Sequence, residues 1–130
     1  MTAPGNLRAE DVSLAYGDGD QVSYAVCGVT MELPEKGFVG VMGPSGSGKS
    51  SLLYLLSGLK RPSSGNVTYH GLRLSAMNER SLVQLRREKF GFVFQQPFLL
   101  NYLTARENVL AAAVSGDRSA GDHAQSLFEA

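Results

Sequence analysis

The sequence predicts an α/β fold, and three features of its pattern support this. Two short runs, FVGVM (38–42) and GFVF (91–94), are continuously apolar, as in strands buried on both faces. The segments before residue 38 are rich in residue types that favour strands. A glycine- and serine-rich stretch, GPSGSGKSS (43–51), separates the first apolar run from an apolar helix. We therefore expect a β-rich N-terminal part, followed by strands that alternate with helices.

The first two strands are expected at residues 7–16 and 22–33, with a turn at 17–20 between them. From Val12 onward the first segment alternates apolar and polar residues, as in a half-buried strand. Valine, threonine and tyrosine are frequent in the second segment. Cys27 lies within that apolar stretch, so we expect a small buried side chain rather than a reactive thiol.

A helix should follow the glycine-rich stretch and end near Gly58, because glycine commonly terminates helices. Its apolar face is expected to consist of Leu52, Leu53, Leu55 and Leu56. A loop at 61–65 and a short strand at 66–70 are expected next.

Two later helices are marked by polar residues at their first turns. Asn78 is placed to cap a helix that runs to about Lys89. The sequence Thr104-Ala105-Arg106-Glu107 matches a capping box and predicts a helix to about Val114. A loop is expected at 115–122, and the residues after it have the pattern of a further helix. In the helix that Asn78 caps, the inward-facing side chains are expected to be Leu82, Val83 and Leu85.

Composition limits the function classes. A chain of 130 residues suffices for one compact domain. Lysine and arginine total 12 and so do aspartate and glutamate, so we expect no nucleic-acid partner. One cysteine cannot form an internal disulfide, which favours a reducing compartment. The N-terminus lacks the features of a secretory signal, and the longest apolar stretch, LLYLLSGL (52–59), is too short to cross a bilayer. A membrane role would therefore require a partner.

Residues 43–50 fit the pattern G-x-x-x-x-G-K-[ST] of a phosphate-binding loop. Glycines keep side chains away from phosphates, which backbone N–H groups then surround. The loop opens a helix, whose N-terminus favours anions. Lys49 supplies a positive charge for the β- and γ-phosphates, and Ser50 supplies a hydroxyl for Mg²⁺. The sequence therefore predicts binding of ATP with Mg²⁺.

Around this loop the chain resembles the ATP-binding subunits of ABC transporters, from residue 7 to about residue 114. The resemblance rests on VSLAYG (12–17), on FVGVMGPSGSGKSSLLYLLSGLKRPSSGNVTYHG (38–71) and on LRREKFGFVFQQPFLLNYLTARENV (85–109). The chain looks most similar to the branch of lipoprotein-release and macrolide-export ATPases, given GDGDQVSY after Tyr16 and the run GFVFQQ.

The resemblance implies a P-loop NTPase core with an N-terminal antiparallel β subdomain, truncated within the helical subdomain. On this interpretation residues 1–130 form the N-terminal portion of one ATPase domain. Its expected parts are the β-rich part and P-loop strand (7–42), the P-loop and its helix (43–58), the strands and helix up to the Q-loop (59–94), and the Q-loop with the start of the helical subdomain (95–130).

The resemblance also implies roles for individual residues. Tyr16 matches the aromatic position that stacks on adenine, and Gln95 matches the Q-loop glutamine that touches Mg²⁺ and the attacking water. Lys49 and Gln95 would be the catalytic residues, and Ser50 and Gln95 the metal-contacting ones. Ser51 stands where many relatives have threonine, and either hydroxyl can bond a phosphate oxygen. The expected nucleotide-binding residues are Tyr16, Gly43, Ser45, Gly46, Ser47, Gly48, Lys49, Ser50 and Ser51.

Partners and location follow from the same resemblance. The Q-loop region would contact a transmembrane permease subunit, and the full-length family forms homodimers. The expected location is cytoplasmic, at the inner face of the cell membrane.

The catalytic motifs that the family carries beyond the Q-loop do not occur in this sequence. There is no LSGGQ-type signature, and neither Asp117 nor Asp122 follows a four-residue apolar strand as in a Walker B motif. Neither His70 nor His123 stands in the context of a switch histidine. We therefore expect an N-terminal piece that binds nucleotide without hydrolysing it by itself. The apolar runs at 38–42 and 91–94 would then have unpaired edges, which favours aggregation.

Two alternatives to a transporter ATPase remain at this point. The first is a non-catalytic nucleotide-binding fragment with no transport role. The second is a different P-loop enzyme, such as a small nucleotide kinase. Such folds usually begin with the P-loop strand, whereas here strand-like sequence precedes it and Gln95 would be unexplained.

Overall fold

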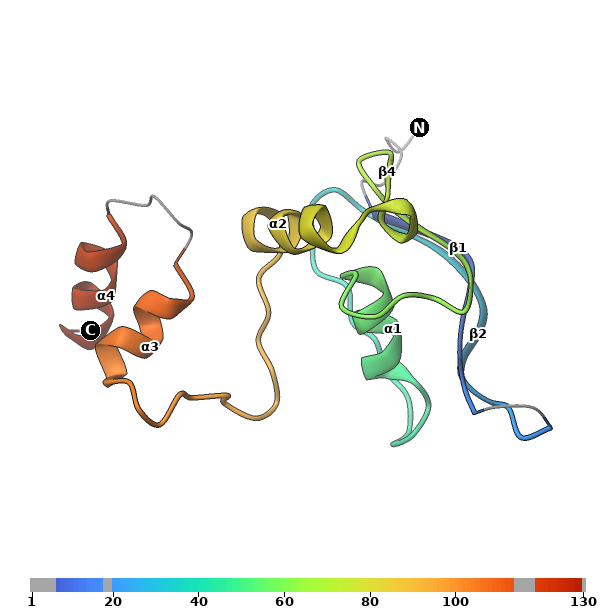
Figure 1. The fold of residues 1–130 in the computed structure, drawn as a ribbon, viewed down its shortest axis with the longest axis horizontal. Helices are drawn as coiled ribbons and strands as arrows, with labels where there is room; N and C mark the ends of the chain where they lie inside the picture. The colour runs from blue at the N-terminus through green and yellow to red at the C-terminus, as the bar shows by residue number, and fades with distance from the viewer. Residues whose placement is uncertain (1–6, 18–19, 114–118, 130) are drawn as a thin grey trace. The chain divides into compact units, whose positions relative to one another are not determined.

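A computed structural model describes residues 7–17, 20–113 and 119–129 of the chain. The chain divides into two compact units, one up to Arg86 and one from Arg87 onward (Figure 1). None of the helices in the described ranges has the length and apolar character needed to cross a membrane.

The first unit contains a four-stranded antiparallel sheet in the order β2-β1-β3-β4. The strands are β1 (Leu7–Tyr16), β2 (Ser23–Leu33), β3 (Ser64–Tyr69) and β4 (Leu72–Arg73). The strands predicted at 7–16, 22–33 and 66–70 are therefore confirmed. β1 is bulged near Asp11, whose φ is 49°, and this shifts its register against both neighbours.

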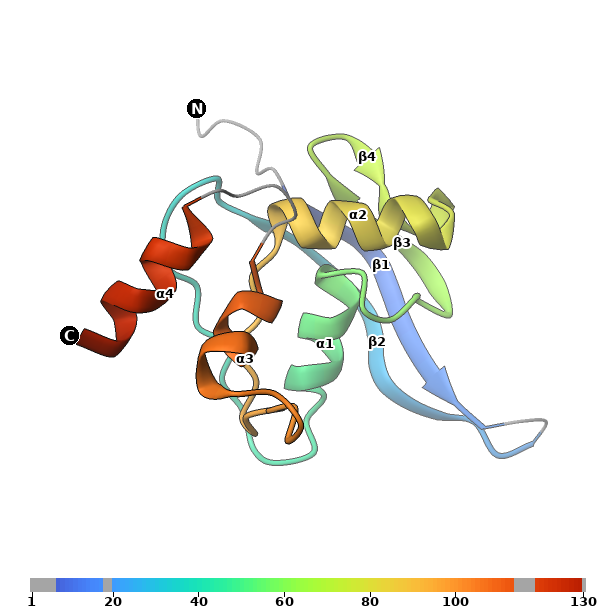
Figure 2. The same cartoon turned by 60° about the vertical axis from the view of Figure 1, so that its left-hand side comes forward.

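Helices pack on this sheet (Figure 2). They are α1 (Lys49–Leu56), the short 3₁₀ helix η1 (Leu74–Ala76) and α2 (Glu79–Lys89). As predicted, Gly58 terminates α1: its φ is 67° and its N–H donates to the Leu55 carbonyl at 3.1 Å. Asn78 caps α2 through its side-chain oxygen, which accepts from the Ser81 N–H at 2.9 Å.

The core lies between the sheet and these helices. Its buried members are Ala9, Val12, Leu14, Val26, Leu55, Leu56, Val67, Leu74 and Leu82. Two residues predicted to face inward do not: Leu53 of α1 is 52% exposed and Val83 of α2 is 40% exposed. Each helix turns about 100° per residue, so the buried stripe takes Leu55 and Leu82 and leaves these neighbours outside.

The second unit contains α3 (Ala105–Ala111) and α4 (Ala120–Glu129). The capping box predicted at Thr104 and Glu107 is present. α3 ends earlier than the predicted Val114, a residue outside the described ranges. α4 begins inside the loop predicted at 115–122, of which residues 115–118 are also outside those ranges.

The prediction of buried strands at 38–42 and 91–94 is wrong for this structure. Neither run belongs to a strand, and Phe38 and Val93 are almost fully exposed. In residues 90–94 the rings of Phe90, Phe92 and Phe94 stack at 6.4 and 5.9 Å between centroids, as alternate residues of an extended chain do. Extended apolar chain becomes a strand when a neighbouring strand accepts its hydrogen bonds, and the described sheet offers neither run that pairing.

Cys27 is also not the buried residue that the sequence predicted. It is exposed, although it lies within β2. Side chains alternate between the two faces of a strand, and in β2 the core position is taken by its neighbour Val26. Apolar composition therefore placed the segment in the sheet correctly but did not determine which face Cys27 occupies.

Candidate functional site

The predicted phosphate loop leads directly into α1. Gly48 is the N-cap residue, with φ 89° and ψ 9°, and Lys49 is the first residue of the helix. The N–H groups of a helix's first turn have no carbonyl partner within the helix, so they are available to an anion. The first intrahelical bond here runs from the Leu52 N–H to the Gly48 carbonyl at 2.8 Å. Because residue 48 is glycine, it can adopt the left-handed backbone conformation that leads from the loop into the helix.

Gly48 also packs closely against the sheet. A Cβ at this position would overlap the carbonyl oxygen of Ala25 and lie 3.2 Å from its carbonyl carbon. Ala25 belongs to β2, so the phosphate loop is held against the backbone of that strand. At Gly43, a Cβ would lie 2.8 Å from the Ser47 hydroxyl oxygen. The loop is thus tight at Gly43 and Gly48, whereas a Cβ at Gly46 would meet no atom within 4 Å.

Lys49 closes the loop on itself. Its ammonium donates to the carbonyl oxygens of Gly43 at 2.9 Å and Pro44 at 2.6 Å, and lies 3.4 Å from the Ser47 hydroxyl. The Ser47 N–H adds a bond to the Pro44 carbonyl at 3.2 Å. The side chain is therefore directed back over the loop, where its positive charge is presented together with the helix N-terminus.

The hydroxyl groups predicted to meet phosphate and metal are at the start of α1. Ser50 is exposed and Ser51 is partly buried, while Ser45 is exposed within the loop. Mg²⁺ usually takes one or two protein oxygens and completes its shell with phosphate and water. The Ser50 hydroxyl fits this donor set. No cluster of three or more acidic, histidine or cysteine side chains forms a metal site elsewhere in the described ranges.

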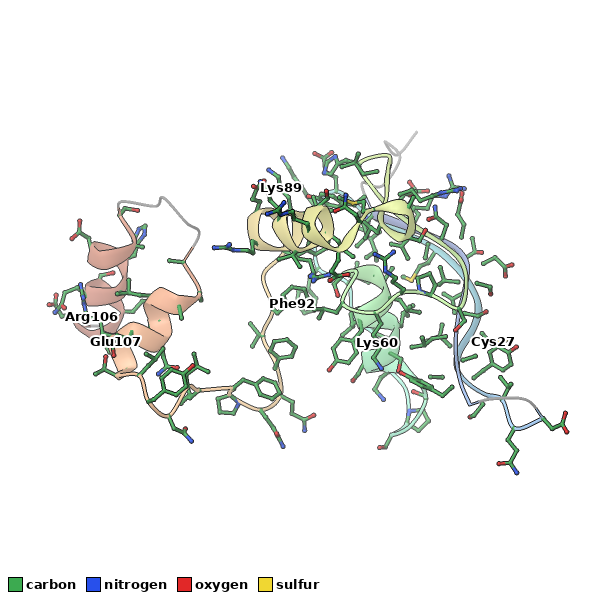
Figure 3. The ribbon with its side chains drawn as sticks, viewed as in Figure 1. Cys27, Lys60, Lys89, Phe92, Arg106 and Glu107 are labelled. Atoms are coloured by element: carbon green, nitrogen blue, oxygen red, sulfur yellow. The ribbon has the colours of Figure 1, made fainter. Side chains whose placement is uncertain are left out.

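A hollow of about 360 Å³ adjoins the loop. One side is formed by β2 and the other by residues 41–44, 47–49 and Leu52. Figure 3 marks Cys27, which contributes to the β2 side. This position of the thiol was not predicted, because the contact between β2 and the phosphate loop joins segments that are separate in the sequence.

Tyr16 ends β1, where it pairs with Ser23 of β2. Ser23 is two residues from Ala25, which touches the phosphate loop, so Tyr16 lies about 7 Å along the strand from that contact. The Tyr16 side chain is 45% exposed. This position suits the predicted role in stacking on a base, and that role stays a prediction.

Lys60 is a neighbour of Tyr16 that sequence reasoning missed. Its ammonium donates to the Tyr16 hydroxyl and lies 4.7 Å from the centroid of the ring. The two residues are 44 positions apart. No local pattern marks such a pair, because the contact depends on how α1 packs beside the end of β1.

Gln95 lies in the second unit, in an exposed bend that follows Phe94. Phe94 packs edge to face on Phe98, with 5.2 Å between ring centroids, and this contact spans the bend. The role of Gln95 at the metal and water stays a prediction.

The ABC transporter family model matches residues 26–130. The chain belongs to the ABC transporter family. It is 39% identical over 120 residues to the macrolide export ATP-binding/permease protein MacB of Marinobacter nauticus, covering 92% of this chain and 19% of that protein. It is 51% identical over 83 residues to the lipoprotein-releasing system ATP-binding protein LolD 1 of Chlorobium chlorochromatii, covering 63% and 34%.

A solved structure extends this likeness to the fold. The ATP-binding cassette MJ0796 of Methanocaldococcus jannaschii, in a dimeric post-hydrolysis state bound to ADP and Pi, matches with a TM-score of 0.83 and 34% identity. The match covers 95% of this chain and 56% of that one. The predicted α/β fold and the predicted membership in the branch with MacB and LolD are thereby confirmed. The chain is an ABC transporter ATP-binding domain sequence that spans less than half the length of the MacB and LolD relatives.

Proposed function

We propose that this chain binds ATP together with Mg²⁺ as the ATP-binding part of an ABC transporter of the MacB and LolD type. The observation that carries the proposal is the loop at 43–48. It meets the N-terminus of α1 through a left-handed Gly48 and presents the Lys49 ammonium over its own carbonyls. The ADP and Pi in the similar cassette MJ0796 support the same conclusion.

Different groups of the chain recognise the phosphates, the base and the metal of the nucleotide. Backbone N–H groups at the start of α1 bind phosphate oxygens, and Lys49 neutralises their charge. Tyr16 provides an exposed aromatic surface for the base. Ser50 holds Mg²⁺ and Ser51 bonds a phosphate oxygen. When bound, Mg²⁺ neutralises charge on the β- and γ-phosphates. Gln95 is proposed to contact the metal and the attacking water.

We further propose that the partner is a transmembrane permease, contacted through the region around Gln95. The name of the MacB relative combines an ATP-binding part with a permease, which supports this partner. The location would then be the inner face of the cell membrane. The dimeric MJ0796 structures support a homodimer for the complete domain.

The chain by itself is proposed to bind nucleotide without turnover. Phosphoryl transfer needs a carboxylate near the metal and a group that positions water. In the described part of the first unit, Glu79 is the one carboxylate that follows the loop, and it pairs with Arg61 at 3.7 Å and Arg86 at 3.4 Å. In the second unit Glu107 is held by the capping box at Thr104.

Titration calorimetry with Mg-ATP tests the binding proposal through Lys49→Ala. Losing a charge-assisted contact to phosphate should weaken binding by about tenfold or more. Lys36→Ala is the matched control, because Lys36 is an exposed lysine in the bend after β2 and lies outside the loop at 43–48. Equal ATP affinity in Lys49→Ala and the unmodified chain, with far-ultraviolet circular dichroism unchanged, would refute the phosphate-loop assignment. Phosphate release above background that depends on Lys49 would refute the absence of turnover.

A further inference from the structure

We propose that Lys60 is a positioning residue for the nucleobase, acting through Tyr16. This inference rests on the proposed nucleotide binding and adds to it a residue outside the phosphate loop. The observation is the contact between two side chains 44 positions apart: the Lys60 ammonium donates to the Tyr16 hydroxyl and lies 4.7 Å from the ring centroid. Figure 3 marks Lys60 beside α1.

The backbone that carries Lys60 is held in place. The Lys60 N–H donates to the Tyr54 carbonyl at 3.0 Å, which attaches it to the last turn of α1. The next residue, Arg61, donates to the carbonyls of Ser75 at 2.9 Å and Met77 at 2.8 Å. The Lys60 side chain therefore extends from an anchored backbone and not from a free loop.

The backbone that carries Tyr16 is attached to the same segment. The Ser63 N–H donates to the Ser13 carbonyl at 2.8 Å, and the Ala15 N–H donates to the Ser63 hydroxyl at 2.9 Å. β1 and the segment after Lys60 are thus bonded to each other directly beside Tyr16. The backbone at both ends of the Lys60–Tyr16 contact is anchored, so forming the contact orders only the two side chains.

The consequence for binding concerns the freedom of the Tyr16 ring. An exposed tyrosine at a strand end has several rotamers, and stacking on a base would require one of them. A hydrogen bond to the hydroxyl, together with the cation near the ring, selects one orientation before the ligand arrives. This preorganisation should strengthen recognition of the base and leave recognition of the phosphates unchanged.

The test separates base recognition from phosphate recognition with two probes, Mg-ATP and Mg-tripolyphosphate, measured by titration calorimetry. The quantity of interest is the ratio of their affinities. In Lys60→Ala we expect this ratio to fall about fivefold, with tripolyphosphate affinity unchanged. Lys60→Arg keeps a cation and a donor, so it should restore most of the ratio. Lys89→Ala, an exposed lysine at the end of α2, is the matched control.

A double-mutant cycle with Tyr16→Leu shows whether the effect passes through the ring. In the Tyr16→Leu background, Lys60→Ala should leave the ratio unchanged. If the unmodified chain prefers Mg-ATP and Lys60→Ala has the same ratio of affinities, the inference is overturned and the proposed function remains. An equal loss on Lys60→Ala with and without Tyr16 would overturn it too, because Lys60 would then contact the nucleotide itself. Tripolyphosphate binding without any ATP preference would overturn both the role of Lys60 and that of Tyr16.

Discussion

Replacing Gly48 by alanine should disrupt the phosphate loop through two separable effects. The first is backbone conformation: Gly48 has a φ of 89°, and a residue with a Cβ pays about 1–2 kcal/mol in the left-handed region. The second is space, since the added methyl group would overlap the Ala25 carbonyl in β2. Relieving that overlap moves α1 away from the sheet, at a cost of about 1–3 kcal/mol typical of overpacking.

Gly46→Ala is the matched control for the first effect alone. Gly46 has a similar φ of 79°, but a Cβ there would meet no atom within 4 Å. We therefore expect Gly48→Ala to lower the free energy of unfolding by about 1–3 kcal/mol more than Gly46→Ala does. Urea denaturation followed by far-ultraviolet circular dichroism measures both values. Equal stability of the two variants, within about 0.5 kcal/mol, would refute the close packing of the loop against β2.

Two further predictions concern the core and the second unit. Leu55 is 1% exposed, so Leu55→Ala should cost about 2–5 kcal/mol in urea denaturation, whereas Leu53→Ala should change stability by about 0.5 kcal/mol or less; similar losses would contradict the assigned face of α1. The Thr104 N–H and hydroxyl donate to the Glu107 carboxylate, and these bonds hold its pKa below the ordinary value. The capping box should therefore persist above the ordinary glutamate pKa and weaken as pH falls through the lowered one. An NMR titration of the Thr104 amide should show that low midpoint, which Glu107→Gln should abolish; a midpoint at the ordinary value would contradict the assignment.

Local signals in the sequence predicted the starts of α2 and α3 and the phosphate loop. A cap acts over three or four residues, so Asn78 and Thr104 marked the starts of α2 and α3 without reference to the rest of the chain. The loop at 43–51 was readable for the same reason, since its glycines, Lys49 and the following helix are contiguous. Its position before an apolar helix was confirmed, and the family followed from residues beside it.

Pairing and packing between distant residues were decided by the tertiary structure. The runs at 38–42 and 91–94 have the composition of buried strands. A strand also needs a neighbouring strand whose N–H and C=O groups lie alongside, and composition does not specify which segment that is. Cys27 is exposed because side chains alternate along β2 and its neighbour Val26 takes the core position. Lys60 meets Tyr16 because α1 and β1 pack side by side, a relation that spans 44 residues. The sequence by itself thus identified the phosphate loop and the family, because both depend on contiguous residues, and the packing of distant segments determined which side chains surround the loop.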